Sequence, residues 1–268
     1  MAQEIVFITG ASSGIGRSIG EFLAQKNYKV YGTSRQPKQD FKNGIHFLAL
    51  DITSTESIEK ATQELIKREG KIDILINNAG VGITGPVEEI PDEQTLNVFQ
   101  TNYFGPVQLI NRVLPFMRKA NKGLIINITS IAGYMGLPFR GHYSASKGAL
   151  QTITEAYRLE LRHTSIKLTT IAPGDFATNI AAGRYHAPVK EDSAYKDNYE
   201  RSLNLMDEHV DNGMNPQEMA EKVYQVIQKK EPKVHYKVGD FLQKISPKLK
   251  GLLSDKFYER ILANHYKL

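Results

Sequence analysis

The sequence predicts a doubly wound α/β protein, in which helices cover both faces of a parallel sheet. Apolar runs bounded by Gly, Asp or Pro alternate along the chain with stretches of helical periodicity. Runs such as IDILIN and LIINI are apolar on consecutive residues, so we expect both faces of those strands to be buried. At 268 residues the chain is near the size at which one core stops growing, so we expect one domain over residues 1–268.

The predicted elements alternate in order along the chain. Strands are expected over residues 5–9, 29–33, 45–50, 72–77, 124–129, 166–172 and 234–238. Helices are expected over residues 14–26, 55–69, 93–120, 143–162 and 216–230. The alternation fails over residues 177–215, where aromatic and aliphatic residues lie among charges without a strand pattern. We expect this irregular insertion to be a lid over the substrate.

Composition excludes several kinds of chemistry. The chain has no cysteine, so disulfides, thiolate zinc sites, iron–sulfur clusters and cysteine nucleophiles are ruled out. Its seven histidines show no metal-ligand spacing, so we expect no metal. The N-terminus enters a strand without the features of a signal peptide, and no apolar run approaches the ~18 residues of a membrane span. We therefore expect a cytoplasmic protein.

The net charge of +5 is concentrated at the C-terminal end. From residue 222 onward there are 11 Lys and Arg against 4 Asp and Glu, whereas the preceding part is close to neutral. No reader motif and no interleaving of basic with aromatic residues accompanies this charge, so we expect no nucleic-acid partner.

A glycine-rich segment, TGASSGIG over residues 9–16, joins the first predicted strand to the first predicted helix. Such a turn lets backbone amides and a helix N-terminus approach a pyrophosphate. The same residues also fit the G-x-S-x-G nucleophile elbow of α/β-hydrolases. Only eight residues precede Thr9, however, which leaves no room for the earlier loop that would supply the oxyanion donor.

Four polar residues are candidates for catalysis. Tyr143 and Lys147 lie four residues apart on a predicted helix, where an ammonium can lower the pKa of a phenol. Ser130 ends a predicted strand at the carboxyl edge of the sheet, where ligands of open α/β sheets bind. Asn102 lies within a long predicted helix, although Asn is a poor helix former. Singly, these residues also fit a solvated helix face, a strand-end turn or an interhelical hydrogen bond.

Together, these segments resemble the short-chain dehydrogenase/reductase family over about residues 4 to 232. The resemblance rests on seven motifs that occur in the family's order and spacing: Thr9-Gly10…Gly14-Ile15-Gly16, Asp51-Ile52, Asn77-Asn78-Ala79-Gly80, Asn102, Ser130, Tyr143…Lys147 and Pro173-Gly174…Thr178. It implies a Rossmann-type fold with a seven-stranded parallel sheet. It also implies nicotinamide-dependent hydride transfer between a cofactor and a hydroxyl or carbonyl group of a small molecule.

The resemblance also implies a role for each residue. Tyr143 would be the acid/base, Ser130 would polarise the carbonyl oxygen, Lys147 would lower the tyrosine pKa and hold the nicotinamide ribose, and Asn102 would support a water-mediated proton relay. Asp51 and Ile52 would border the adenine, Asn77 would lie near the adenine ribose, and Thr178 would meet the nicotinamide carboxamide. The expected cofactor-binding set is Gly10, Ser12, Ser13, Gly14, Ile15, Gly16, Ser34, Arg35, Asp51, Ile52, Asn77, Ala79, Gly80, Tyr143, Lys147, Pro173, Gly174 and Thr178.

The residues after the second predicted strand indicate NADP(H) rather than NAD(H). An NAD-binding site places an acid there, about 20 residues past the glycine motif, to bind the ribose 2′-hydroxyl. This chain has Ser34 and Arg35 instead, which offer donors and a positive charge to a 2′-phosphate. We therefore predict an NADP-dependent oxidoreductase that acts on a moderately apolar small molecule. The alternative is a catalytically silent nucleotide-binding regulator or scaffold of the same fold.

The residues beyond the resemblance, 233–268, form a basic extension. Ser246 and Pro247 fit an N-cap and the first position of a helix. Apolar residues then recur at helical spacing as far as Leu262, with charged residues between them. We expect this face to cover the substrate cleft or a neighbouring subunit of a homo-oligomer, a dimer or tetramer. Peripheral contact with a membrane surface is the less favoured alternative.

Overall fold

The computed structural model describes residues 3–176, 183–211 and 213–268, with backbone only for 207–211. Its centre is an eight-stranded sheet in the order β10-β8-β7-β5-β1-β2-β4-β3. All neighbouring strands are parallel except β3, which pairs antiparallel with β4 at the edge. The strands of this sheet are β1 (Ile5–Ile8), β2 (Lys29–Ser34), β3 (Phe41–Lys42), β4 (Ile45–Ala49), β5 (Ile74–Asn77), β7 (Gly123–Ile128), β8 (Ile166–Pro173) and β10 (His235–Val238).

The doubly wound architecture is therefore confirmed, with seven parallel strands and one short addition. No sequence pattern indicated β3, because its two residues are both exposed and too few to alternate. Because the seven strands are parallel, their carboxyl ends lie along one edge of the sheet. The segments that carry the resemblance follow these ends.

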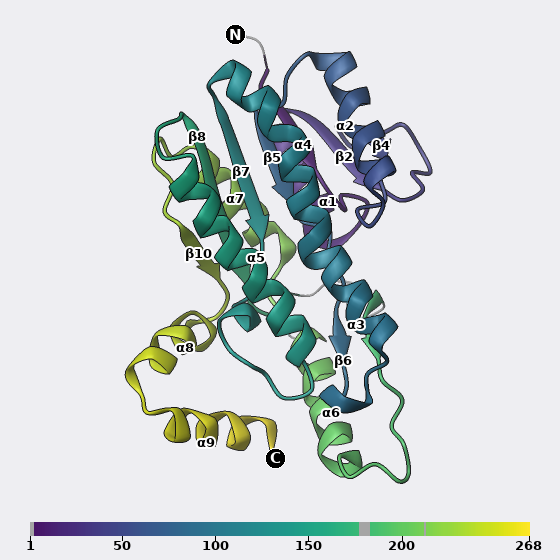
Figure 1. The fold of residues 1–268 in the computed structure, drawn as a ribbon, viewed down its shortest axis with the longest axis vertical. Coiled ribbons are helices and arrows are strands. Elements are labelled where there is room, and N and C mark those ends of the chain that lie inside the picture. Colours follow the sequence, from purple (N-terminus) through teal and green to yellow (C-terminus); the bar gives the residue numbers. More distant parts are fainter. Residues whose placement is uncertain (1–2, 177–182, 212) are drawn as a thin grey trace.

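Helices cover both faces of the sheet (Figure 1). Alternate residues of β1 enter different cores: Val6 and Ile8 pack with α1 and α7, whereas Ile5 and Phe7 pack with α2 and α4. This explains why the strands are apolar on consecutive residues. The helices are α1 (Gly14–Gln25), α2 (Thr55–Glu69), α3 (Asp92–Phe99), α4 (Gly105–Ala120), α5 (Gly141–Glu160), α6 (Lys196–Asp211), α7 (Pro216–Ile227), α8 (Phe241–Leu252) and α9 (Asp255–Tyr266).

The single helix predicted over residues 93–120 is interrupted in the structure. A π-helical turn, Gln100–Phe104, separates α3 from α4. Pro106 has no N–H to donate to the carbonyl of Asn102, so a regular α-helical bond is missing at this point. Such turns often occur at functional sites. Here the interruption includes Asn102, one of the four catalytic candidates.

The segment 177–215 was predicted to be irregular, and this was wrong for most of its described part. Residues Tyr185–His186 form β9, which pairs in parallel with β6 (Ile83–Thr84), and α6 follows. In α6, Tyr199, Ser202 and Met206 are buried at helical spacing. The sequence signal was weak because the other faces of α6 are densely charged. Residues 177–182, including Thr178, and residue 212 lie outside the described part.

The tail also differs from the prediction. It forms two helices, α8 and α9, and the first begins at Phe241 rather than at Pro247. The Asp240 side chain caps α8 by accepting from the Gln243 N–H. Pro247 lies inside α8 and has no N–H to donate to the Gln243 carbonyl. The Ser246 hydroxyl donates to that carbonyl instead. Within the described residues, no helix has the length and apolarity to cross a bilayer.

Candidate active site

The glycine-rich turn between β1 and α1 is fastened to the end of β5. The Asn78 amide donates to the carbonyls of Thr9 and Gly10, at 3.0 and 3.1 Å. The Thr9 hydroxyl accepts from the backbone N–H groups of Asn78 and Ala79. A Cβ on Gly16 would lie 2.3 Å from the Gly10 carbonyl oxygen, so only glycine fits there. Thr9 and Asn78 belong to the predicted motifs, but their role in positioning this turn depends on contacts about 70 residues apart in the chain, which no local pattern indicates.

The turn leads into a helix N-terminus whose side-chain cap is absent. Ser13 precedes α1 and makes no cap hydrogen bond with its side chain. The first N–H groups of a helix carry partial positive charge and suit a phosphate. Ser12, the residue before it, lines a cavity of about 830 Å³. The beginning of α1 therefore has the geometry for one end of a dinucleotide.

The same cavity is basic on its other side. Ser34, Arg35, Lys38 and Lys42 line it, beyond the carboxyl end of β2. Ser34 and Arg35 were predicted from the sequence, but the two lysines were not, although they follow the second strand closely. No acidic side chain is among the residues that line this cavity. Its charge suits a phosphate group.

Three residues of the predicted cofactor set have side chains engaged with the protein. The Asp51 carboxylate accepts from the backbone N–H and the hydroxyl of Thr53. Asn77 is buried and donates to the side chain of Asn127 on the adjacent strand, at 2.8 Å. Ile52 is part of the apolar core. The cofactor contacts of Asp51, Ile52 and Asn77 stay predictions.

Ser130 and Tyr143 meet at a second cavity, of about 80 Å³, at the carboxyl edge of the sheet. Pro173 and Gly174, at the end of β8, line it too. The Ser130 hydroxyl lies close enough to Tyr143 to lower the pKa of its phenol by hydrogen bonding. Ser130 also accepts from the Ala132 N–H, which begins a short 3₁₀ turn, Ile131–Tyr134, and fixes the serine side chain. Two hydroxyls thus share the space that a carbonyl oxygen would occupy.

Lys147 lies one turn after Tyr143 on α5 and is only 5% exposed. Its ammonium donates to the Ile128 carbonyl at 3.1 Å. Burial lowers the pKa of Lys147 to about 8. A Cβ on Gly80 would lie 3.1 Å from both the Lys147 Nζ and the Asn102 Oδ1. The Lys147 ammonium and the Asn102 amide oxygen therefore both lie next to Gly80, whose lack of a side chain leaves room for them.

Asn102 is held by three hydrogen bonds. Its Oδ1 accepts from the Val81 N–H and its Nδ2 donates to the Val81 carbonyl, both at 2.9 Å. The Nδ2 also donates to the Ser146 hydroxyl, which in turn donates to the Tyr143 carbonyl. Asn102 thus fixes the segment after β5 against the first turn of α5. Ser146 was not among the predicted site residues, although it lies within the Tyr143…Lys147 motif.

The charges around Tyr143 differ from the expectation. Burial raises the pKa of Tyr143, while its hydrogen bond to Ser130 and the positive charges of Arg140 and Arg184 lower it. The charge of Asp175 acts in the opposite direction. Lys147 is not among the groups that shift this pKa, so its expected effect on the tyrosine stays a prediction. Arg140, Asp175 and Arg184 all line the cavity.

These observations describe two cavities, one basic and one with two hydroxyls, at one edge of a doubly wound sheet. A family model described as short chain dehydrogenase matches residues 4–188 of this chain. The chain belongs to the short-chain dehydrogenase family. It is therefore an oxidoreductase, and nicotinamide cofactors are typical of its relatives.

Two curated relatives cover most or all of this short-chain dehydrogenase. The 3-ketodihydrosphingosine reductase of Bacteroides thetaiotaomicron is 37% identical over 269 residues, which is 100% of both chains. The NADPH-dependent 3-dehydrocapnine reductase of Ornithobacterium rhinotracheale is 32% identical over 246 residues, which is 87% of each chain. A solved short-chain dehydrogenase from Streptomyces avermitilis has a TM-score of 0.84 at 25% identity and covers 100% of this chain and 98% of that one.

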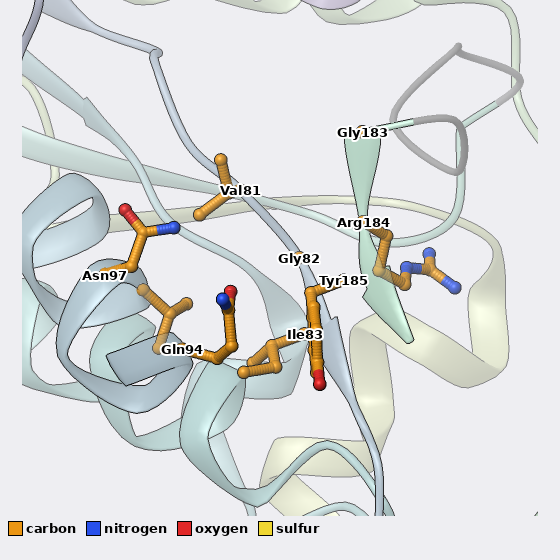
Figure 2. Close-up of a pocket in the computed structure, with 9 residues that line it drawn as sticks. Val81, Gly82, Ile83, Gln94, Asn97, Gly183, Arg184 and Tyr185 are labelled. Carbon is orange, nitrogen blue, oxygen red and sulfur yellow. The ribbon is translucent and has the colours of Figure 1, made fainter. Parts of the chain in front are cut away.

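A further pocket, of about 240 Å³, adjoins the Tyr143 cavity of this short-chain dehydrogenase (Figure 2). Gln94 and Asn97 of α3 lie on one side of it, and Ile83 and Tyr185 on the other. Arg184 lines both cavities, and its side chain in Figure 2 points away from Gln94 and Asn97. Sequence analysis could not single out Arg184, because it lies in the segment without a clear pattern.

The described part of the 177–215 segment packs beside the catalytic tyrosine. Ala187, Tyr199 and Met206 form a core cluster with Ile83 and neighbouring residues, and Tyr143 packs against this cluster. The Tyr199 hydroxyl donates to the carbonyls of Thr84 and Ala187 and so ties α6 to the β6–β9 pair. The segment therefore borders the site.

Proposed function

We propose that this chain catalyses the NADPH-dependent reduction of a ketone to an alcohol in 3-ketodihydrosphingosine or a closely related long-chain 3-ketone. The main observation that supports this reaction is that the hydroxyls of Ser130 and Tyr143 lie at one cavity. The full-length match to a 3-ketodihydrosphingosine reductase supports the class of substrate.

In this proposal the chain's residues handle the carbonyl oxygen. Ser130 and Tyr143 donate hydrogen bonds to it and stabilise the negative charge that develops there. Tyr143 then gives its proton to that oxygen, which completes the alcohol. Because burial raises the pKa of Tyr143, its phenol is protonated at neutral pH and ready to act as an acid. Lys147, Asn102 and water return a proton to the tyrosine.

The residues present fit a nicotinamide dinucleotide. Ser13 provides no side-chain cap at the start of α1, where the first N–H groups suit a phosphate, and Ser12 of the same turn lines the basic cavity. Gly10 to Gly16 would hold the pyrophosphate, Ser34 and Arg35 the 2′-phosphate, and Tyr143 and Lys147 the nicotinamide ribose. When bound, NADPH supplies the hydride that reduces the carbonyl carbon.

Replacing Arg35 with alanine should change the choice of cofactor. Loss of a charge-assisted hydrogen bond to the 2′-phosphate should lower kcat/KM for NADPH about 10- to 100-fold. The value for NADH, which lacks this phosphate, should change little. Initial rates with each cofactor at a fixed ketone concentration measure both values. Arg118→Ala, on the exposed last turn of α4, is the control and should leave both unchanged. A wild-type preference for NADH would contradict the proposal.

The described residues of 183–206 support the interpretation of this segment as a lid, because they pack against Tyr143. In this proposal the segment covers the long-chain substrate from the side of α6. Hydrogen exchange of α6 should slow when NADP⁺ and the alcohol product are both present.

The proposed substrate class is tested directly by the rate of NADPH oxidation. With 3-ketodihydrosphingosine, kcat/KM should exceed that for a short-chain analogue with the same head group about a hundredfold, because each buried methylene adds binding energy. Simple sugars carrying a ketone should not be reduced. If the protein binds NADPH but reduces no ketone offered, it is the silent nucleotide-binding regulator instead.

A further inference from the structure

The C-terminal helices α8 and α9 expose an unusual number of apolar side chains. The described part of the chain presents twelve exposed large apolar side chains, and seven of them lie after residue 240. We name these seven the tail strip: Phe241, Leu242, Leu249, Leu252, Phe257, Ile261 and Leu268. Three of them, Phe241, Leu242 and Leu252, are 71%, 71% and 81% exposed. Such a concentration marks an interaction surface.

The strip is a face of each helix and not a consequence of poor packing. At 100° per residue, the four α8 members, Phe241, Leu242, Leu249 and Leu252, fall within about a third of the helix circumference. Phe257 and Ile261 are four residues apart on α9 and share one side of that helix. In Figure 1 both helices stand out from the main body, beyond β10.

Other apolar residues of the tail, next to those of the strip, pack against the chain itself. Leu253, Tyr258 and Leu262 join a cluster with Ile131 and Met135. The tail therefore has an inner face that holds it in place and an outer face that nothing covers in the described part of the chain. The apolar residues that the sequence predicted on a single helix face are therefore shared between the inner and the outer face of the tail.

The inner face reaches the catalytic cavity. The Gln243 amide donates to the Asp175 carboxylate at 2.8 Å, and Arg140 donates to the Tyr266 hydroxyl at 3.3 Å. Asp175 and Arg140 both line the cavity that holds Tyr143. The two helices that bear the tail strip are therefore tied directly to residues that line the site.

The charge of the tail selects the kind of partner. Beside the strip, α8 and α9 and the last residues carry six basic side chains and two acidic ones. The basic residues are Lys244, Lys248, Lys250, Lys256, Arg260 and Lys267. Two copies of this face would bring like charges together, which disfavours self-association through it. The partner should attract the basic side chains and also bury the apolar side chains of the strip. A bilayer interface with anionic lipids has both properties, and it accepts apolar side chains at any position.

We propose that α8 and α9 dock this protein on an anionic membrane surface, with the tail strip inserted among the lipids. The inference goes beyond the proposed reaction and does not depend on the identity of the substrate. Docking would place the Tyr143 cavity next to the bilayer, where a long-chain molecule can enter it without crossing water.

The test is flotation of the full-length protein with vesicles of phosphatidylcholine containing phosphatidylglycerol, compared with vesicles of phosphatidylcholine alone. The double variant Leu242→Ser/Leu252→Ser removes two strip residues that make little contact with the protein, so it should fold normally. Leu159→Ser is the matched control, since Leu159 is also 71% exposed but lies at the end of α5.

We expect the wild type and Leu159→Ser to float with anionic vesicles, and high salt to reduce binding because exposed charges are screened. The double variant should lose at least about tenfold in bound fraction, because two inserted leucines are lost. Absence of wild-type binding to anionic vesicles would overturn the proposal. So would a double variant that still floats normally, or one whose oligomer is smaller by light scattering, which would make the strip an interface between copies.

Discussion

Tyr143→Phe should lower kcat for ketone reduction by about a thousandfold, because it removes the proposed proton donor and keeps the ring. The ring packs against the cluster around Tyr199 and Phe139, so the fold should be retained. Affinity for NADPH should change less than about threefold, since most of the proposed cofactor contacts lie elsewhere. Single-turnover and steady-state rates with saturating NADPH, together with fluorescence titration of the cofactor, measure the two effects separately.

Tyr157→Phe is the control for this experiment. Tyr157 lies on the same helix, α5, and its hydroxyl donates to Asn111 away from the cavity. Its loss should leave kcat within about twofold. A Tyr143→Phe protein that kept more than about a tenth of the wild-type kcat would show that another group donates the proton.

Lys147→Met should lower kcat/KM at least about a hundredfold and at the same time stabilise the cofactor-free protein. Burial lowers the pKa of Lys147 from 10.5 to about 8. At pH 7 the lysine is protonated in the folded and unfolded states, and the folded state bears the full cost of a buried charge, about 3 kcal/mol. Loss of the hydrogen bond to Ile128 offsets about 1 kcal/mol of this. A net gain of about 2 kcal/mol corresponds to a rise in Tm of about 5 °C.

The sign of the pH dependence follows from the lowered pKa. Between pH 8 and 10.5 the unfolded chain holds a proton on Lys147 that the folded protein has lost, so wild-type stability rises with pH in this window. The advantage of Lys147→Met should therefore shrink between pH 7 and pH 10 in thermal unfolding. Lys122→Met is the control: hydrogen bonding to Glu4 raises the pKa of Lys122, so its replacement should give no gain. A Lys147→Met protein less stable than wild type at pH 7 would contradict this account.

Much of the fold could be predicted from the sequence because its determinants are local. Consecutive apolar residues in β5 and β7 indicate strands buried on both faces, and the alternation with amphipathic helices indicates a parallel sheet. Ser130, Tyr143 and Lys147 could be placed at one edge for the same reason. Parallel strands end at a common edge, and a spacing of four residues puts two side chains on one face of a helix.

The elements that were missed or misplaced depend on contacts between distant residues. Pro106 breaks the regular helix locally, but the side chain of Asn102 in the π-turn is held by hydrogen bonds to Val81, 21 residues earlier in the chain. The first turn of α8 has a local cap, Asp240, and is also tied to Asp175, 68 residues earlier, by the Gln243 amide. Ser246 and Pro247 offered an equally good local signal for a later start. Local patterns cannot choose between two such possibilities when tertiary contacts stabilise one of them.

The sequence by itself determined the seven parallel strands, most of the helices between them and the nature of the reacting groups, because periodicity and short motifs act over a few residues. Only the tertiary structure decided what surrounds those groups. Arg140, Asp175 and Arg184 come from three separate segments, and their charges act together on Tyr143 because the fold brings them to one cavity. Electrostatic interactions and apolar burial depend on distance in space, and so the local pKa values and the exposed face of the tail could be found only once the chain was folded.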